Sequence, residues 1–262
     1  MTASLVLRLA GPLQAWGSSS QFNRRETDEA PTKSGVIGLL AAAQGRRRHD
    51  PIEDLVGLSL AVRIDQPGTL LRDFHTVSTM DGLPLLSATL SAKGEQRPVT
   101  SGKTTHVTHR FYLQDAVFVV VVGAADAELV AGLADAVRHP VFPLALGRRS
   151  CVPTQPLLLR CGEGDLWPGE PLEVLAAVPW QANAQTQSRA SRDQVELPIT
   201  ADRPQLVPLG AIEDNRVDVP SGFAPGQRHL RTREVVHLWM TVPTGSKSRT
   251  PQHDPFDLLG AV

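Results

Sequence analysis

The chain has 262 residues, enough to bury a large core as one domain or to divide into two smaller ones. Its 26 lysines and arginines nearly balance 27 aspartates and glutamates, so a site for a polyanion would have to be a local patch. The two cysteines, Cys151 and Cys161, are too few for a disulfide framework and lack metal-ligand spacing. Because neither a signal peptide nor an apolar run of membrane length occurs, we expect a cytoplasmic protein.

The first predicted element is a strand at residues 5–9, where leucines alternate with Val6 and Arg8, as in a strand with one face in the core. The loop that follows, residues 13–25, carries Trp16 and ends on two arginines. An aromatic among small residues and arginines suits a nucleic acid. A tryptophan in such a place more often closes over the edge of a core, and this alternative stays open.

The central predicted helix begins near Lys33 and ends near Gly45. Thr32 or Ser34 can cap its first turn, and Gly45 can take the left-handed conformation that ends a helix. Lys33, together with the free N–H groups at the positive helix end, would make an anion site. The alternative is a packing helix whose lysine is merely solvated.

A second strand at residues 58–64 precedes a long excursion, about residues 69–113. In the excursion, two runs of β-forming residues flank a middle rich in turn formers, and the runs hold too few apolar residues for a central strand. They therefore predict a long hairpin that projects from the body. An excursion of this length without its own core is usually functional or disordered.

Regular elements return with a buried strand at residues 116–122, a helix capped by Asp126, and a last strand at residues 157–159. This order predicts an α+β fold: a ferredoxin-like or RNA-recognition-type (RRM) βαββαβ domain, with the hairpin inserted between its second and third strands. Such a domain has a sheet face that often binds RNA, although a fold does not dictate a function.

The rest of the chain carries weaker signals, so we divide it into three parts. The ferredoxin-like domain takes residues 1–161, and residues 162–244 form a smaller, mostly β region. Within that region, residues 195–225 contain prolines throughout and predict at best short strands, whereas residues 229–242 predict a strand. The polar residues 245–262 are expected to be a flexible tail.

Several apparent catalytic motifs fail. Residues 101–104 resemble the end of a phosphate-binding loop, but Arg97 occupies the position of the required first glycine and no helix follows. His106 and His109 have the spacing of metal ligands without convincing further ligands nearby. A nucleophilic pair of Cys151 with a histidine is possible in principle, although a buried cysteine is commoner. We expect no nucleotide, metal or other cofactor.

Four stretches occur in an order that resembles the CRISPR-associated Cas5 family, in the form found in type I-E Cascade complexes. They are LRLAGPLQAWG (7–17), PTKSGVIGLL (31–40), YLQDAVF (112–118) and FPLALGRRSC (142–151). The resemblance covers about residues 4–160. It implies one copy per antiviral surveillance complex, bound to the 5′ handle of the CRISPR RNA. It also implies a thumb hairpin against the backbone subunit CasC, an interface with the large subunit CasA, target DNA only through the assembled complex, and no membrane.

The excursion at residues 69–113 falls where this thumb belongs, and residues 147–151 fall where the family has a glycine-containing loop near the RNA. The candidate RNA-binding residues are Gln14, Trp16, Arg24, Lys33, Ser34, Arg46, His75, Lys103, His109, Arg110, Tyr112, Arg148, Arg149, Ser150 and Cys151. Because aromatic residues make up only 5% of the chain, we predict contacts mainly to backbone phosphate. Arg25, Arg47 and Arg48 rank behind the other cations, since runs of charge usually face solvent.

The family also supplies an alternative function. Type I-C members cleave the precursor RNA themselves, without metal, with Tyr, Lys and His residues. Lys33, His75, His106, His109 and Tyr112 supply these residue types, so a metal-independent endoribonuclease is the alternative. In type I-E systems a separate subunit makes the cut. We therefore favour a non-catalytic RNA-binding subunit.

Overall fold

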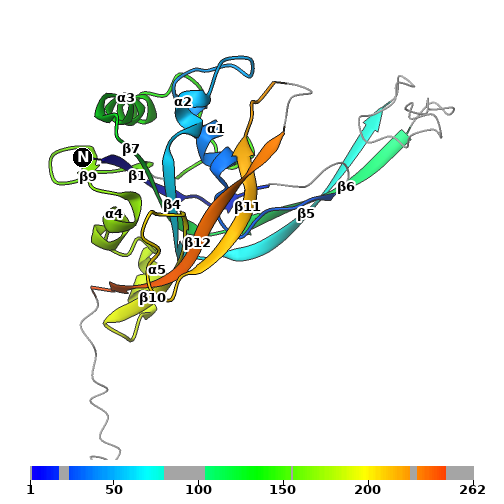
Figure 1. Ribbon diagram of the computed structural model, residues 1–262. Helices are drawn as coiled ribbons and strands as arrows, with labels where there is room; N and C mark the ends of the chain where they lie inside the picture. The colour runs from blue at the N-terminus through cyan, green and yellow to red at the C-terminus, as the bar shows by residue number, and fades with distance from the viewer. Residues whose placement is uncertain (1, 18–23, 80–103, 155, 225–228, 246–262) are drawn as a thin grey trace, which may run out of the picture.

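The computed structural model describes residues 2–17, 24–79, 104–154, 156–224 and 229–245 (Figure 1). The predicted tail beyond residue 245 and the candidate Lys103 lie outside the described residues. The fold is mixed α+β, as predicted, and is dominated by sheet. Its helices are α1 (Lys33–Ala43), α2 (Glu53–Val56), α3 (Ala127–Arg138), α4 (Pro171–Ala177) and α5 (Ala184–Arg189).

The main sheet has eight strands, all in antiparallel pairs. They are β1 (Ala3–Ala10), β4 (Ser59–Gln66), β7 (Val117–Ala124), β8 (Leu158–Leu159), β9 (Leu166–Pro168), β10 (Gln194–Asp202), β11 (Ile212–Pro220) and β12 (Leu230–Pro243). Their order is β11–β12–β10–β4–β7–β1–β8, and β9 also pairs with β1. A smaller sheet contains β2 (Leu13–Gln14), β3 (Arg24–Arg25), β5 (Thr69–Thr79) and β6 (Thr104–Gln114).

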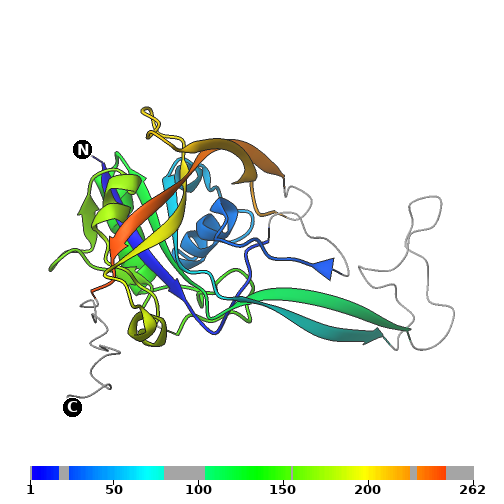
Figure 2. The ribbon, with the colours of Figure 1, turned by 90° about the horizontal axis from the view of Figure 1, so that it is seen from below.

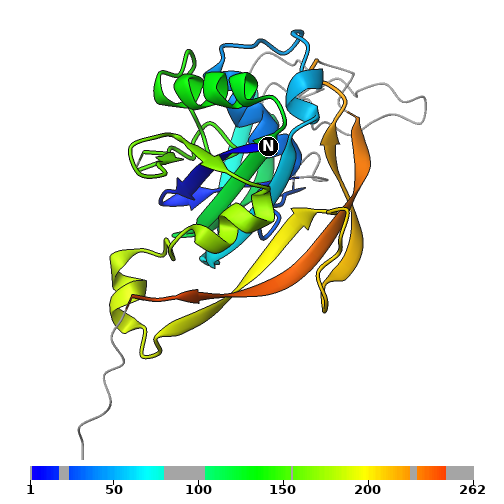
Figure 3. The same cartoon turned by 60° about the vertical axis from the view of Figure 1, so that its left-hand side comes forward.

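The centre of the main sheet is covered on both faces (Figure 3). On one face α1 and α3 pack on Leu5, Leu7 and Leu9 of β1, and on the other α4 packs on Val6. Val6 and Arg8 are buried, so the prediction of a β1 with only one core face was wrong. The free sheet face through which an RRM-type domain binds RNA is also absent here, because α4 and its neighbours bury it.

Both ends of α1 form as predicted, because each end depends on residues only a few positions apart. The Thr32 hydroxyl accepts a hydrogen bond from the Gly35 N–H at 3.2 Å and caps the first turn. Gly45 has a φ of +76°, and its N–H and the next one bond to carbonyls of the last turn, which is a Schellman motif. Asp126 caps α3 in the same way, with hydrogen bonds from two N–H groups.

Strands β5 and β6 form a two-stranded ribbon that projects from the body (Figures 1 and 2). The described arms pair from Thr69 opposite Gln114 out to Thr79 opposite Thr104. The ribbon leaves the body at Gly68, where φ is +73° and an added Cβ would lie 2.4 Å from the Gln114 carbonyl oxygen. On its other edge, the base of β6 pairs with β2 and β3, so the ribbon is tied to the loop that follows β1.

The C-terminal strands continue the main sheet, because β10 pairs with β4. The prediction of at best short strands before residue 225 was wrong: β10 and β11 have 9 residues each. Pro198 is tolerated within β10 because pairing with β4 starts only at Ile199, so no ladder bond on that side is lost. The strand predicted at residues 229–242 is confirmed as β12.

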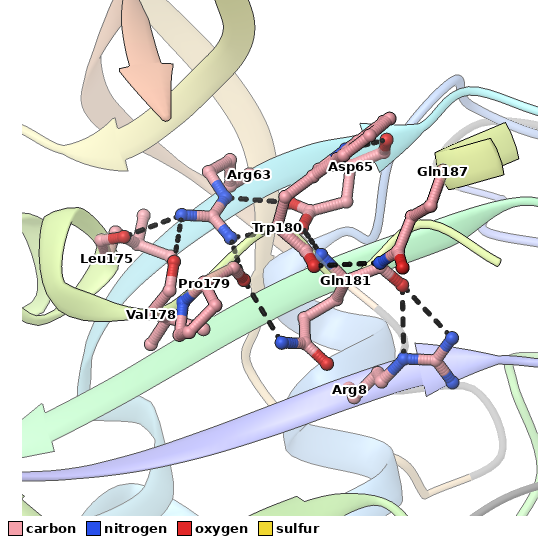
Figure 4. Close-up of polar contacts among 9 residues, drawn as sticks. All are labelled: Arg8, Arg63, Asp65, Leu175, Val178, Pro179, Trp180, Gln181 and Gln187. Atoms are coloured by element: carbon pink, nitrogen blue, oxygen red, sulfur yellow. Dashed lines mark hydrogen bonds and ion pairs between the residues drawn. The ribbon is translucent and has the colours of Figure 1, made fainter. Parts of the chain in front are cut away.

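A buried arginine fastens the segment after α4 to the sheet (Figure 4). The side chain of Arg63 on β4 is fully buried, and it forms an ion pair with Asp65 at 2.7 Å. Its remaining donors bond to the carbonyl oxygens of Leu175, Val178 and Pro179 at 2.7, 2.8 and 3.0 Å. Every donor of this guanidinium is therefore used within the chain.

The partners of this pair extend along the same segment (Figure 4). The Trp180 indole N–H donates to the Asp65 carbonyl at 2.9 Å, and the Gln181 N–H donates to the Asp65 carboxylate. Two donors of Arg8 on β1 bond to the Gln181 carbonyl at 3.2 and 3.0 Å. We call Arg63, Asp65 and these partners the buried arginine node. It holds the connection between α4 and β10 against β1 and β4.

Candidate nucleic-acid interface

A cleft of about 730 Å³ lies between α1, the loop before β8 and the end of the β11–β12 hairpin. Residues 15–17 and 25–26 form another part of its wall. Its described lining carries six arginines and one acidic residue, Glu26. The arginines are Arg25, Arg46, Arg47, Arg48, Arg148 and Arg149. We call this site the arginine cleft.

The lining of the arginine cleft suits the backbone of a polyanion. Its cations are concentrated in a protein whose formal net charge is only −1, so the positive field is local. The α1 wall consists largely of small residues, including Ser34, Gly38 and Ala42, which let a bulky chain approach the helix closely. Guanidinium groups match phosphate oxygens with paired donors.

Arg148 is built into the wall. Its guanidinium lies 4.8 Å from the ring centroid of Tyr112 and donates to the Phe111 carbonyl at 2.9 Å. It also donates to the carbonyls of Arg25 and Glu26 at 2.8 and 3.1 Å. Arg148 therefore joins the base of β6 to the loop that holds Arg25. Its charge faces the cleft, but its first role is to fix the wall in place.

The loop that carries Arg148 requires a glycine at position 147. Gly147 has a φ of +88°, and an added Cβ would lie 1.8 Å from the Ala15 carbonyl oxygen. The Cys151 carbonyl accepts from the Leu146 N–H at 2.7 Å and closes the loop. Burial raises the pKa of the Cys151 thiol, which opposes a nucleophilic role. Cys151 is thus a buried loop residue, while Ser150 is exposed.

The arginines that follow α1 differ in their partners. Arg46 is a structural cation: it pairs with Asp54 and donates to the Pro51 carbonyl at 2.8 Å, and the hydrogen bonds that Arg46 donates to the Asp54 carboxylate raise the pKa of Arg46. Arg47 and Arg48 are exposed, line the cleft and have no ion-pair partner among the described residues. The sequence ranked Arg46 ahead of Arg47 and Arg48 and could not show that Arg46 has a partner, because that partner, Asp54, comes from α2.

The two remaining arginine pairs, Arg148–Arg149 and Arg24–Arg25, also combine one arginine that has partners within the chain with one that is available in the cleft. Arg149 is exposed in the cleft and has no ion-pair partner in the described part of the chain. Arg24 pairs with Glu26 at 2.7 Å and lies 5.0 Å from the Phe111 ring centroid, outside the cleft lining. Its neighbour Arg25, ranked lower from sequence, lines the cleft.

The start of α1 is not an open anion site, which corrects the prediction for Lys33. The Lys33 side chain is buried and pairs with Asp202 at 2.9 Å, and its N–H donates to the Asp218 carboxylate at 2.9 Å. The positive helix end is therefore already neutralised by a carboxylate from β11. Arg233 completes the cluster through ion pairs with both aspartates.

Asp218 is the most buried carboxylate of this cluster. Burial alone would raise the pKa of Asp218, but the hydrogen bond and charge of Arg233, with the Lys33 N–H, outweigh it and hold that pKa below its ordinary value. Asp218 therefore stays charged at neutral pH. Lys33, Asp202, Asp218 and Arg233 form an internal cluster that joins α1 to β10, β11 and β12.

Gln14 and Trp16 are also internal. Gln14 is fully buried, and its amide donates to the carbonyls of Leu9 and Ala116 at 3.1 and 2.7 Å. The Trp16 indole donates to the Gln14 side chain at 3.1 Å, and its ring packs so closely on Gly35 that an added Cβ would lie 2.8 Å from it. With 1% exposure, Trp16 closes over the core edge and cannot stack on a base.

The remaining candidates lie on the ribbon. His75 pairs with Asp73, and the His109 ring lies 5.9 Å from that of Phe74. The buried Nε of Arg110 and Nδ1 of His109 have no hydrogen-bond partner within the described chain. Tyr112 is buried beneath Arg148. Of these ribbon residues, Tyr112 adjoins the cleft wall, through its contact with Arg148.

The β11–β12 hairpin contributes Phe223, His229 and Leu230 to the cleft, and the sequence analysis missed all three. Phe223 reaches α1, where a Cβ added to Gly38 would lie 3.6 Å from its ring. The two glycines one turn apart in α1 were a usable signal, since each admits an aromatic ring. The glycines alone do not tell which aromatic residues fill these positions, because Trp16 and Phe223 come from other segments of the chain.

Three of the residues proposed for the alternative nuclease, in the described part of the chain, are engaged at separate places. Lys33 is paired with Asp202, Tyr112 lies beneath Arg148, and His75 is paired with Asp73. The side chain of His106 is outside the described residues. Within the described ranges, no group of three His, Cys, Asp or Glu side chains could hold a metal ion. No described helix is long and apolar enough to cross a membrane.

Comparison with known proteins shows the family to which this fold belongs. A family model described as "CRISPR-associated protein (Cas_Cas5)" matches residues 4–236. The chain therefore belongs to the CRISPR-associated Cas5 family. It is 38% identical over 173 residues to the CRISPR system Cascade subunit CasD of Escherichia coli (strain K12), which covers 61% of this chain and 71% of that protein.

Two solved structures extend the comparison to almost the whole chain. One is a chain of a "CRISPR RNA-guided surveillance complex", with 36% identity, a TM-score of 0.67, and coverage of 92% of this chain and 91% of that one. The other, "Crystal structure of Cas protein", has 29% identity, a TM-score of 0.61, and coverage of 92% and 95%.

Proposed function

We propose that this chain is a non-catalytic subunit of a Cascade-type CRISPR surveillance complex and holds the 5′ handle of the CRISPR RNA in the arginine cleft. The observation that carries the proposal is the cleft itself, in a protein of nearly balanced charge. Four of its arginines, Arg25, Arg47, Arg48 and Arg149, are exposed and have no ion-pair partner among the described residues. The similarity to CasD and to a chain of an RNA-guided surveillance complex supports the same role in antiviral defence.

The contacts in this proposal are chiefly with phosphate. Arg47, Arg48 and Arg149 are the primary contacts, because their guanidiniums are available, and Arg25 is a fourth. Ser34 supplies a hydroxyl in the same wall. Arg148 acts indirectly by joining the base of β6 to the loop that holds Arg25, which fixes the wall in place.

The fold proposal is a ferredoxin-like core within residues 1–161 plus a β-rich C-terminal region. It is supported by the strand order β8–β1–β7–β4 and by the sequence order of strands and helices, with α1 and α3 on one face. The C-terminal strands extend the same sheet and complete the cleft. We therefore expect that residues 1–161, without the C-terminal region, would not bind RNA as the full chain does.

The ribbon is proposed as the thumb that contacts the neighbouring backbone subunit CasC. Leu70, Phe74 and Val107 are 64%, 61% and 43% exposed and project from one face of the ribbon, as its register shows. Exposed apolar residues grouped on a projecting element suit a protein partner. Contact with CasA is proposed from the family resemblance alone.

The test of RNA binding uses the purified chain with repeat RNA, with and without EDTA. We expect intact, bound RNA in both conditions. Cleavage that persists in EDTA would support the endoribonuclease instead, and absence of binding would overturn the proposal. The double variant Phe74→Asp, Val107→Asp tests the thumb, because it places charge on the exposed apolar face of the ribbon. Unfolding should stay cooperative and RNA should bind, but assembly with CasC should be lost. Normal assembly would refute the thumb.

A further inference from the structure

Among the strands that the structure describes, the second half of β12, residues 238–243, has a neighbour on one side only. Strand β10 pairs along all of it, whereas β11 pairs with β12 only as far as His237, opposite Ile212. The chain before Ile212 turns away at Leu209 and Gly210, where the Gly210 φ is +82°. In the described ranges, no other backbone hydrogen bond reaches this edge. We call residues 238–243 the open edge.

Large apolar side chains stand beside the open edge. Trp239 and Ile212 are each 69% exposed. Ile212 lies opposite His237, two residues from Trp239, so the two side chains project from the same face as diagonal neighbours. Leu209, at the turn before Ile212, is fully exposed. The opposite face of the strand packs inward through Leu238 and Met240.

Before its last residue, Pro243, the open edge lacks the devices that normally protect a strand edge. Proteins blunt such edges with charged residues, prolines or bulges. Residues 238–242 read Leu-Trp-Met-Thr-Val, with no charge and strong β-forming residues. The outer edge strand β11 is different, since its first half carries Glu213, Asp214 and Arg216. The edge formed by β11 is therefore protected by charge, whereas the open edge of β12 remains suited to pairing with another strand.

We propose that the open edge binds an extended, uncharged segment of another protein subunit of the surveillance complex. That segment adds a strand beside β12, in line with β11, and covers Trp239 and Ile212. A protein strand fits better than RNA, because the edge offers backbone pairing and apolar side chains and has no cation to hold phosphate. The inference rests on the proposed function, which places the chain in a complex with other subunits.

The test compares hydrogen exchange at the amides of residues 238–242 in the assembled complex and in the free full-length chain. Strand addition should slow exchange of the outward-facing amides by about tenfold or more, because each gains a hydrogen bond. The double variant Trp239→Lys, Thr241→Lys should lose one protein subunit from the complex in native mass spectrometry. The control is Val217→Lys, at a 55% exposed position in the paired part of the same hairpin, and its complex should stay intact.

RNA binding is measured on the same variants, so that the two proposals can fail separately. The double lysine variant should bind handle RNA as the unchanged chain does; failure of the unchanged chain to bind would refute the proposed function instead. Unchanged exchange in the complex would overturn the docking edge. Two further results would also overturn it. Protection in the free chain that disappears on removal of residues 246–262 would identify the chain's own tail as the bound segment. Protection that rises with the concentration of the free chain would identify a second copy.

Discussion

The buried arginine node and the arginine cleft contain the same residue type in opposite circumstances. Arg63 is fully buried, and every donor of its guanidinium has a partner within the chain. Arg47 and Arg149 are exposed and have no ion-pair partner among the described residues. The difference shows that partners, and not residue type or position in a motif, separate an arginine that holds the fold from one available to a ligand.

The largest expected effect is on stability and comes from the buried arginine node. Arg63→Ala would leave the Asp65 carboxylate buried and unpaired, so we expect a loss of about 3–5 kcal/mol in the free energy of unfolding. Urea denaturation measures this loss. Arg63→Met with Asp65→Leu removes both charges and should recover part of it. Equal losses in the single and double variants would show that the ion pair does not govern the stability of this region.

The next effect tests whether Lys33 is a structural cation, as Arg63 is, or an RNA-binding one, as proposed for the cleft arginines. Lys33→Ala removes the ion pair with Asp202, which keeps Arg233 as a partner, so we expect a smaller loss of about 1–3 kcal/mol. The salt dependence of RNA binding should not change, because this lysine is already paired. A stable variant with a flatter salt dependence would return Lys33 to the RNA site.

A smaller effect concerns acid stability through Asp218. Its folded pKa lies below its ordinary value of 3.8 despite burial, because Arg233 and the Lys33 N–H stabilise the charged form. The unfolded state therefore takes up this proton first as the pH falls. The contribution to stability is complete above the ordinary value and is lost as the pH falls through the folded pKa.

Urea unfolding measured between about pH 5 and about pH 2 checks this behaviour. Asp218→Asn should be less stable at neutral pH and should lose stability less steeply with acid than the unchanged chain. Parallel curves for the two proteins would mean that another carboxylate is responsible for the acid sensitivity.

The separation along the chain between interacting residues decides which features of the molecule could be predicted from its sequence. The caps at Thr32 and Gly45 and the arms of the ribbon were predicted because each depends on its immediate neighbours. The length of β10 was not, since Pro198 is tolerated only because of where β4 begins to pair.

The site was harder to predict than the fold for the same reason. Arg46 and Arg47 are adjacent and chemically identical, and only the position of Asp54 on α2 makes the first structural. Lys33 receives its partner from Asp202, 169 residues away. No local pattern distinguishes an engaged cation from a free one, so a sequence reader ranks them by motif and misplaces some.

The measurement that tests the central claim most directly is the salt dependence of handle-RNA binding by the double variant Arg47→Ala, Arg149→Ala. Its matched control, Arg189→Ala with Arg192→Ala, removes two exposed arginines that do not line the cleft. Two lost phosphate contacts should flatten the slope of log affinity against log salt by about 1.4, since each contact on a single strand contributes about 0.7. The control should keep the original slope. An unchanged slope in the cleft variant, or an equal change in both, would contradict the assignment of the arginine cleft to RNA.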